Sequence, residues 1–288
     1  MARLSSKLVN QSVAIGELKT MEKLGQNLDS KQYWADEANR YSDALENDYH
    51  KHRLDVIRSL IPAELFQRKK QIFDFGCGDA VLFPWFIEAQ GKIEGIDISP
   101  EIINIGQQRL TNLGLDSSLI KVGNVNYLKE IPSASLDGLL SFNVLAYLTD
   151  EEELIFYQEA SRIVKPGGYL IVTHSNSLFD MFSLNQYTIN FIKDNLILSN
   201  SAQLSNLLTH ANAESKATYN VRENPLSYHH KLRKFNFKEE KQEFINLHIL
   251  PPPLLQDKSY PSTLNFAEEE RWKLMFICSI FGSCAIRF

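Results

Sequence analysis

Cysteine, long apolar runs and excess positive charge are all scarce in this chain of 288 residues. The three cysteines, an odd number without metal-ligand spacing, give no disulfide framework and favour a reducing compartment. The longest apolar stretch, residues 274–286, is shorter than the roughly 20 residues of a membrane-spanning helix. Residues 1–16 lack the continuous apolar segment of a signal peptide. These absences predict a cytoplasmic protein without membrane insertion.

Acidic residues slightly outnumber basic ones, 35 Asp and Glu against 30 Lys and Arg, for a net charge of -5. A broad nucleic-acid interface is normally basic, so this balance argues against nucleic acid as a partner. The content of 44% hydrophobic and 23% charged residues is ordinary for a globular protein, and the length is enough to bury a large core. The composition leaves open whether the chain forms a homodimer.

The most informative stretch is residues 72–80, Ile-Phe-Asp-Phe-Gly-Cys-Gly-Asp-Ala. An apolar run, with Asp74 inside it, leads into Gly76 and Gly78, which stand one residue apart. Glycine lets the backbone turn sharply and lets a ligand approach where a Cβ would clash. A strand that enters such a loop and then a helix is typical of the nucleotide-side pocket of a doubly wound α/β sheet.

A second short apolar strand, residues 92–97, ends in Asp97, about 20 residues after Gly76, where an acidic side chain can accept both ribose hydroxyls. Nicotinamide dehydrogenases share this arrangement, but their fingerprint needs Gly or Ala where this chain has Val81. Asp79 would also put a negative charge beside a pyrophosphate. These residues favour a ligand with a positive centre and no phosphate, and S-adenosylmethionine is such a ligand.

Five motifs, in order across residues 71–175, resemble those of the class I S-adenosylmethionine-dependent methyltransferases. The third departs from the family pattern, which usually has Asp where this chain has Asn124. The resemblance implies an α/β fold with a doubly wound, mostly parallel seven-stranded sheet and an antiparallel last strand at about residues 281–288. The five motifs are residues 74–79, 95–99, 123–125, 136–148 and 162–173.

The rest of the chain is arranged around this core. Residues 1–70 show helical spacing and no strand pattern, and we expect an N-terminal helical lid there. Residues 71–175 alternate strands and helices, which indicates a parallel sheet that binds the cofactor. A helical substrate cap is expected at residues 176–225, inserted after the fifth strand, and residues 226–288 are expected to complete the sheet. The first five strands are expected at residues 71–75, 92–97, 119–122, 137–142 and 168–174.

In this fold, ligands bind beyond the carboxyl ends of the strands, where the strand order reverses. The resemblance implies that Asp74 holds the amino group of the cofactor, that Asp97 holds its ribose and that Asn124 pairs with the adenine amino group. Asp74 could instead cap a turn, and Asn124 could be a plain turn residue. The expected cofactor-binding residues are Asp74, Gly76, Cys77, Gly78, Asp97, Ile98, Asn124, Val125 and Asn143.

His174 directly follows the fifth strand, beside Asn143 and Tyr147 in the expected site. A histidine there can act as a general base near neutral pH, so His174 and Tyr147 are candidate catalytic and substrate-binding residues. An oxygen acceptor usually needs its proton removed, so His174 favours an oxygen over a nitrogen acceptor. The alternative is a histidine that is hydrogen-bonded at a strand end.

Three aromatic residues of the N-terminal segment, Tyr33, Trp34 and Tyr41, are further candidates for substrate binding. They could cover the sulfonium or the substrate through cation–π and apolar contacts. Equally, they could hold the N-terminal helices on the sheet. No metal site is expected.

The sequence therefore predicts an S-adenosylmethionine-dependent methyltransferase that releases S-adenosylhomocysteine. Its acceptor is expected to be a small molecule, such as a natural-product, sugar or lipid precursor. Two other interpretations stay open: a non-catalytic regulatory or scaffolding subunit that binds the same cofactor, and a nucleotide-dependent oxidoreductase.

Overall fold

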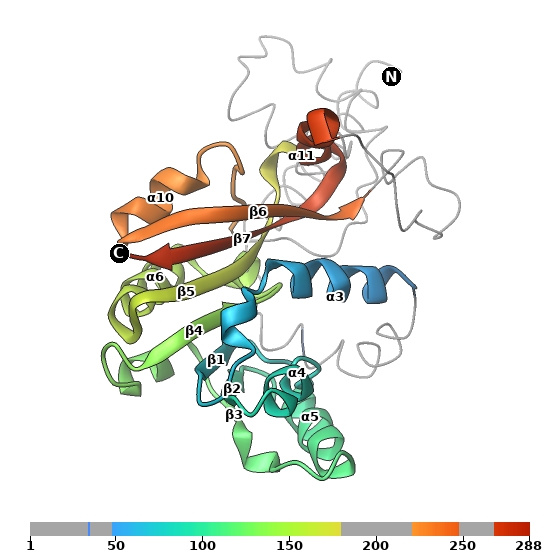
Figure 1. The fold of residues 1–288 in the computed structure, drawn as a ribbon, viewed down its shortest axis with the longest axis vertical. Helices are drawn as coiled ribbons and strands as arrows, with labels where there is room; N and C mark the ends of the chain where they lie inside the picture. The colour runs from blue at the N-terminus through green and yellow to red at the C-terminus, as the bar shows by residue number, and fades with distance from the viewer. Residues whose placement is uncertain (1–33, 35–47, 180–220, 248–267) are drawn as a thin grey trace, which may run out of the picture.

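The computed structural model describes Trp34 and residues 48–179, 221–247 and 268–288. They form a seven-stranded sheet with the order β3-β2-β1-β4-β5-β7-β6 (Figure 1). The strands are β1 (Gln71–Phe75), β2 (Lys92–Asp97), β3 (Ile120–Val122), β4 (Leu136–Ser141), β5 (Val164–Ser175), β6 (Phe237–Leu247) and β7 (Cys278–Arg287).

The strand directions make the sheet mostly parallel. β1 pairs in parallel with β2 and β4, β2 with β3, and β4 with β5. The last strand, β7, runs antiparallel to both of its neighbours, β5 and β6. These pairings confirm the predicted fold, and they put the reversal of strand order between β1 and β4.

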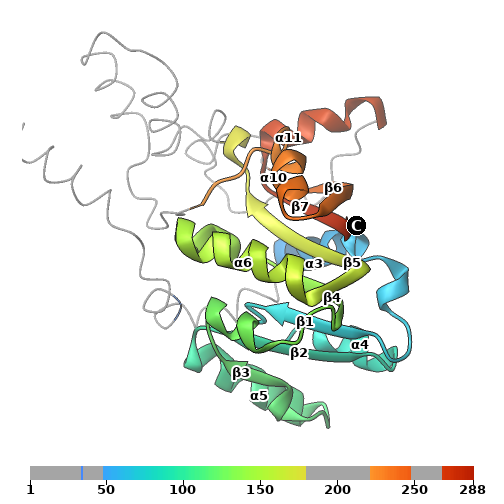
Figure 2. The ribbon, with the colours of Figure 1, turned by 90° about the vertical axis from the view of Figure 1, so that its left-hand side faces the viewer.

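Helices cover both faces of the sheet (Figure 2). On one face lie α6 (Asp150–Ile163) and α10 (Tyr228–Lys234), and on the other lie α3 (Asp48–Leu60), α4 (Phe83–Glu88) and α5 (Pro100–Asn112). Each layer buries its own apolar core against the strands, which is the main favourable term in folding. The first core contains Phe156, Tyr157 and Leu232, and the second contains Ile57, Phe83 and Leu110.

Capping residues begin helices α5 and α6 at the carboxyl edge of the sheet. The hydroxyl of Ser99 accepts a hydrogen bond from the backbone N–H of Ile102 at 3.2 Å, and Pro100 opens α5. Thr149 and Glu152 form a reciprocal capping box at the start of α6. These local signals explain why the two helices begin at Pro100 and Asp150.

The structure differs from the sequence-based expectation mainly on the β5 side. β5 begins at Val164 rather than at residue 168, because the chain becomes extended directly at the end of α6. β7 begins at Cys278 rather than near residue 281. Most of the predicted lid and cap lies outside the described residues, although α3 packs on the sheet through Ile57 and Leu60. No helix of the described part is long and apolar enough to cross a membrane.

Candidate functional site

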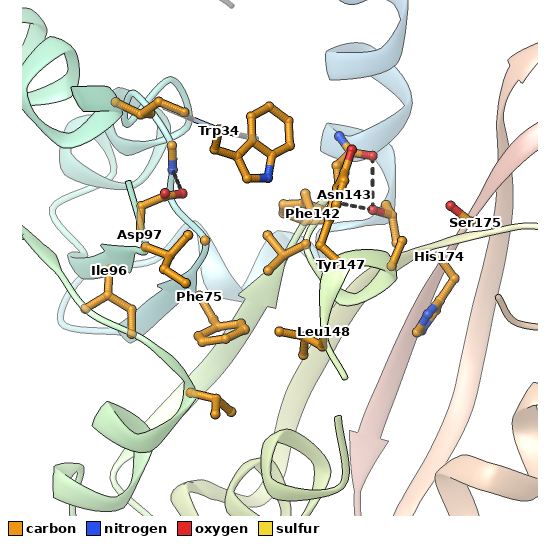
Figure 3. Close-up of a pocket in the computed structure, with 18 of the residues that line it drawn as sticks. Trp34, Phe75, Ile96, Asp97, Phe142, Asn143, Tyr147, Leu148, His174 and Ser175 are labelled. Atoms are coloured by element: carbon orange, nitrogen blue, oxygen red, sulfur yellow. Dashed lines mark hydrogen bonds between the residues drawn. The ribbon is translucent and has the colours of Figure 1, made fainter. Parts of the chain in front are cut away.

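A cavity of about 250 Å³ lies beyond the carboxyl ends of the parallel strands (Figure 3). Its lining comes from the loops after β1, β2, β3 and β4 and from the end of β5, with additions from α3, β6 and β7. This position matches the switch point, where doubly wound sheets bind their ligands. The cavity is therefore the candidate functional site.

The loop after β1 passes close to two neighbouring segments. Gly76 and Gly78 both have positive φ, +77° and +54°, a conformation that favours glycine. A Cβ at Gly76 would lie 2.0 Å from Cγ2 of Val144, in the loop after β4. The backbone N–H groups of Gly76 and Cys77 donate to the carbonyl of Ile96 at 2.8 and 2.9 Å. The two glycines therefore let this loop cross the end of β2 and pack against the β4 loop.

Asp97 stands at the end of β2 with its carboxylate on the cavity. One oxygen, Oδ2, accepts from the backbone N–H of Gly78 at 3.1 Å (Figure 3). The other accepts from the backbone N–H of Ser99 at 2.9 Å. Burial raises the pKa of Asp97, while these hydrogen bonds act in the opposite direction. Each carboxylate oxygen can accept a second bond, so Asp97 can still bind a pair of ligand hydroxyls.

The cavity wall next to Asp97 is apolar and includes Ile98, Ile102 and Val125. Asn124 lies beside them, and its side-chain oxygen accepts from the backbone N–H of Asn126 at 3.0 Å. Asn124 therefore acts as a turn-capping residue and still lines the cavity. Its carboxamide oxygen has a second lone pair for a ligand.

Two of the predicted cofactor-binding residues lie behind the loop instead of on the cavity lining. Asp74 is buried in β1, 3% exposed, and its Oδ1 has no hydrogen-bond partner. Burial, with a smaller contribution from the charge of Asp97, raises the pKa of Asp74 to about 8. Cys77 is also buried and packs against β2, where a Cβ at Gly95 would come within 2.7 Å of its Cβ.

Asp79 does not face the cavity. It is 1% exposed, and Arg109 of α5 forms an ion pair with its Oδ2 at 3.1 Å. Burial raises the pKa of Asp79, and Arg109 opposes that shift. The expectation that this carboxylate would repel a pyrophosphate is therefore wrong. The argument against a nicotinamide cofactor now depends on Val81 alone.

Asn143, Tyr147 and Trp34 lie together across the cavity from Asp97 (Figure 3). Asn143 has a positive φ of 59°, and its backbone N–H donates to Oγ1 of Thr173 at 2.7 Å. The rings of Trp34 and Tyr147 meet edge to face, with centroids 5.2 Å apart. The structure thus brings these three predicted residues into the site. Tyr33 and Tyr41 lie outside the described residues.

The imidazole of His174 points away from the cavity, although the residue is part of its lining (Figure 3). It is 2% exposed, and Nε2 shares a hydrogen bond with the hydroxyl of Tyr157 at 3.1 Å. The Tyr157 hydroxyl also pairs with that of Tyr228 at 2.7 Å. Burial lowers the pKa of His174 well below 6.5. This geometry does not support His174 as a general base, and it favours the alternative of a hydrogen-bonded histidine at a strand end.

Five polar lining residues were not predicted from the sequence: Arg53 of α3, Glu152 of α6, Thr173 and Ser175 of β5, and Asn246 of β6. Glu152 carries a visible signal, because it occupies the third helical position after Thr149. Arg53 stands in a charged helical segment, where nothing distinguishes it from its solvated neighbours. Asn246 lies far from every motif, and only the folded sheet brings it to the cavity.

A family model described as a methyltransferase domain matches residues 66–248. Demethylmenaquinone methyltransferase of Geobacillus stearothermophilus is 28% identical over 151 residues, which cover 49% of this chain and 60% of that protein. A ubiquinone/menaquinone biosynthesis C-methyltransferase of Pasteurella multocida is 28% identical over 127 residues, which cover 41% and 44%. The chain thus spans about half the length of the curated relatives it matches.

A solved structure with a similar fold is magnesium protoporphyrin IX methyltransferase from Synechocystis, which contains bound S-adenosylhomocysteine. The TM-score is 0.57 at 11% identity, and the match covers 90% of this chain and 97% of that one. At this identity the likeness shows the fold alone.

Proposed function

The chain belongs to the methyltransferase domain family of S-adenosylmethionine-dependent enzymes, and we propose that it transfers a methyl group to a small aromatic acceptor. One observation carries this proposal. The carboxylate of Asp97, the Gly76–Gly78 loop and the apolar wall at Ile98 and Val125 meet in a single cavity at the switch point of the sheet. These features suit the ribose and purine of a nucleoside, and the family match identifies the cofactor as S-adenosylmethionine.

The residues fit the adenosyl cofactor at three places. Asp97 offers free lone pairs to two ribose hydroxyls, and Ile98 and Val125 offer apolar surface to a purine ring. Asp74, behind the loop and outside the cavity lining, also has an unpartnered Oδ1, and the Asp74→Asn variant tests whether an ammonium group reaches it. The loop glycines leave room for close approach.

The bound cofactor supplies a methyl group on a positively charged sulfur. The chain's own residues then orient the reactants and exclude water, which can account for a large part of the acceleration. Trp34 and Tyr147 present aromatic surface to a positive centre in the cavity. Thr173 fixes the backbone of Asn143 in its left-handed conformation and so holds the β4 loop in place.

The remaining cavity wall supports an aromatic acceptor. Phe142, Val144 and Ile280 line this part together with Tyr147. The two curated relatives are named for methylation of quinone precursors, and we propose the same broad class of acceptor here. The preference for an oxygen acceptor depended on His174, whose ring points away from the cavity. Carbon is therefore an equal candidate for the methylated atom.

Calorimetric titration of the purified protein with S-adenosylhomocysteine and, separately, with NAD tests the cofactor part of the proposal. We expect micromolar binding of the first and no binding of the second. Binding of NAD alone would contradict the proposal and favour the oxidoreductase. Binding of S-adenosylhomocysteine, without methyl transfer from labelled S-adenosylmethionine to any of a panel of phenols and quinols, would favour the non-catalytic subunit.

A further inference from the structure

Arg53 is the one Lys or Arg side chain among the described residues that line the cavity. It projects from α3, and its Nε is buried without a hydrogen-bond partner. A buried N–H group without a hydrogen-bond partner destabilises the folded protein, so such groups call for an explanation. A ligand oxygen in the cavity would supply the missing partner.

Asn246 is a second lining residue with a buried polar atom that lacks a hydrogen-bond partner. It lies near the end of β6, is 8% exposed and lines the same cavity. Its Oδ1 is buried without a hydrogen-bond partner. The positive φ of 63° explains why Asn is tolerated at this backbone position, but it does not explain the unpartnered oxygen.

Packing between α3 and β6 brings Arg53 and Asn246 toward the same end of the sheet. Nζ of Lys241 donates to the carbonyl of Ser59 at 2.7 Å, which fixes the helix on the strand. α3 and β6 run in opposite directions (Figure 1). Arg53, which precedes Ser59 on the helix, and Asn246, which follows Lys241 on the strand, therefore lie on the same side of this contact.

Several other polar groups of the cavity already have protein partners. Asp97 accepts two backbone N–H groups, and Glu152 accepts that of Thr149 at 2.9 Å. The backbone N–H of Asn143 is bonded to Thr173. Among the buried polar side-chain atoms of the described lining, those without a hydrogen-bond partner are thus Nε of Arg53 and Oδ1 of Asn246.

We propose that Arg53 and Asn246 form an oxygen-binding subsite for the acceptor, which carries an anionic oxygen and a hydroxyl group on an aromatic ring. The guanidinium would hold a carboxylate or a phenolate oxygen, and Oδ1 of Asn246 would accept from the hydroxyl. Phe142 and Ile280 line the same cavity and offer apolar surface to the ring. This inference rests on the proposed function, of which it specifies the substrate class.

The test is calorimetric binding of three probes to the complex of the full chain with S-adenosylhomocysteine: protocatechuate, its methyl ester and catechol. We expect protocatechuate to bind at least about tenfold more tightly than its ester if the anion is a carboxylate. If the anion is a phenolate, catechol should bind at least as tightly as protocatechuate, and its affinity should rise with pH. Binding of none of the three at millimolar concentration, or equal binding at every pH, would overturn the inference.

Matched variants locate the subsite. Arg53→Gln should weaken the best probe about tenfold, whereas Arg58→Gln, on the same helix but stacked on Phe66 and Trp85, should leave it unchanged. Asn246→Asp should also weaken it, because a carboxylate would face the anion. Asn236→Asp is the control, since Asn236 has a similar positive φ of 61° and lies outside the cavity lining.

The affinity for S-adenosylhomocysteine separates this inference from the proposed function. It should stay within about twofold of the wild-type value in Arg53→Gln and Asn246→Asp. A tenfold loss in Arg53→Gln would assign Arg53 to the cofactor and overturn the subsite. No binding to the wild-type protein would instead remove the proposed function. Unchanged probe binding in both variants would overturn the subsite alone.

Discussion

The two ends of the cavity differ in how their polar groups are satisfied. At the β1–β2 end, the backbone N–H groups of Gly78 and Ser99 bond the carboxylate of Asp97. At the β6 end, Arg53 and Asn246 each bury a polar atom without a partner. The first end is held in shape by the protein's own hydrogen bonds, whereas the second leaves bonds for a ligand to complete.

This difference teaches how a family can keep one cofactor and change its acceptor. The cofactor end is built from short loops whose geometry depends on backbone hydrogen bonds and glycines, as at Gly76. The proposed acceptor end is built from side chains of α3 and β6, which lie far apart in the sequence. Substitution of a side chain there can alter the ligand without disturbing the cofactor loops.

Asp97→Ala should produce the largest change, at the cofactor end. Hydrogen bonds from a buried carboxylate to two hydroxyls are worth roughly 2–4 kcal/mol, so the affinity for S-adenosylhomocysteine should fall by a factor on the order of 100. Titration calorimetry measures this. Asp116→Ala is the control, because Asp116 caps a short helix away from the cavity. Near-normal binding by Asp97→Ala would falsify the ribose assignment.

Gly76→Ala should show how tightly the cofactor loop is packed. The positive φ costs an Ala side chain roughly 1–2 kcal/mol, and the contact with Val144 adds roughly 1–3 kcal/mol of overpacking. Gly114→Ala is the matched control, because Gly114 has a φ of +71° but no atom within 4 Å of the added Cβ. Urea unfolding should give a clearly lower free energy of unfolding for Gly76→Ala. Equal values for the two variants would show that the loop can move aside.

The sequence predicts which loops reach the β1–β2 end of the cavity, because the signals there are local. The run from Asp74 to Gly78 and the strand that ends in Asp97 each place a few neighbouring residues, and their geometry follows from backbone rules. The same local reasoning does not see that Asp74 and Cys77 lie behind the loop. Which side chains reach the cavity depends on the neighbouring strands, and those are far away in the sequence.

His174 shows more clearly where prediction from the sequence fails. Side chains alternate along a strand, so His174 shares a face with Leu170 and Val172, which pack in the core beneath α6 and α10. That alternation is visible in the sequence. What the sequence does not show is that this face of β5 is covered by Tyr157 and Tyr228 rather than by the cavity.

Asp74 is an exception among the polar groups of the cofactor end, because its buried carboxyl lacks a full set of hydrogen-bond partners. The variant Asp74→Asn tests the consequence. The pKa of the Asp74 carboxyl rises from 3.8 in the unfolded chain to about 8 in the folded protein. Its contribution to the free energy of unfolding is therefore fully present below pH 3.8 and is lost as the pH rises through about 8. The wild-type free energy of unfolding should therefore fall by roughly 2 kcal/mol more than that of Asp74→Asn between pH 6 and 8. Urea unfolding at several pH values measures this, and parallel curves would contradict it.

The same variant also probes the cofactor. An ammonium group beside Asp74 would favour its ionised form, so the affinity of the wild-type protein for S-adenosylhomocysteine should rise with pH toward about 8. Asp74→Asn should bind about tenfold more weakly at pH 8 and lose the pH dependence. Retention of that dependence in the variant would assign it to another group.

His174 tests whether the acceptor end contains a proton-transfer group, and here we expect the smallest effect. Because burial lowers the pKa of His174 well below 6.5, its imidazole should stay neutral in the folded protein near neutral pH, while the same ring in urea titrates near 6.5. Stability is then lost as the pH falls below 6.5, by about 1 kcal/mol at pH 6, and His174→Gln should remove this slope. Histidine C–H resonances in NMR spectra give the titration directly, with His174→Gln as the assignment control. A folded-state midpoint near neutral pH would restore His174 as a candidate base and would make the acceptor end a site of proton transfer, beyond the oxygen binding that Arg53 and Asn246 suggest.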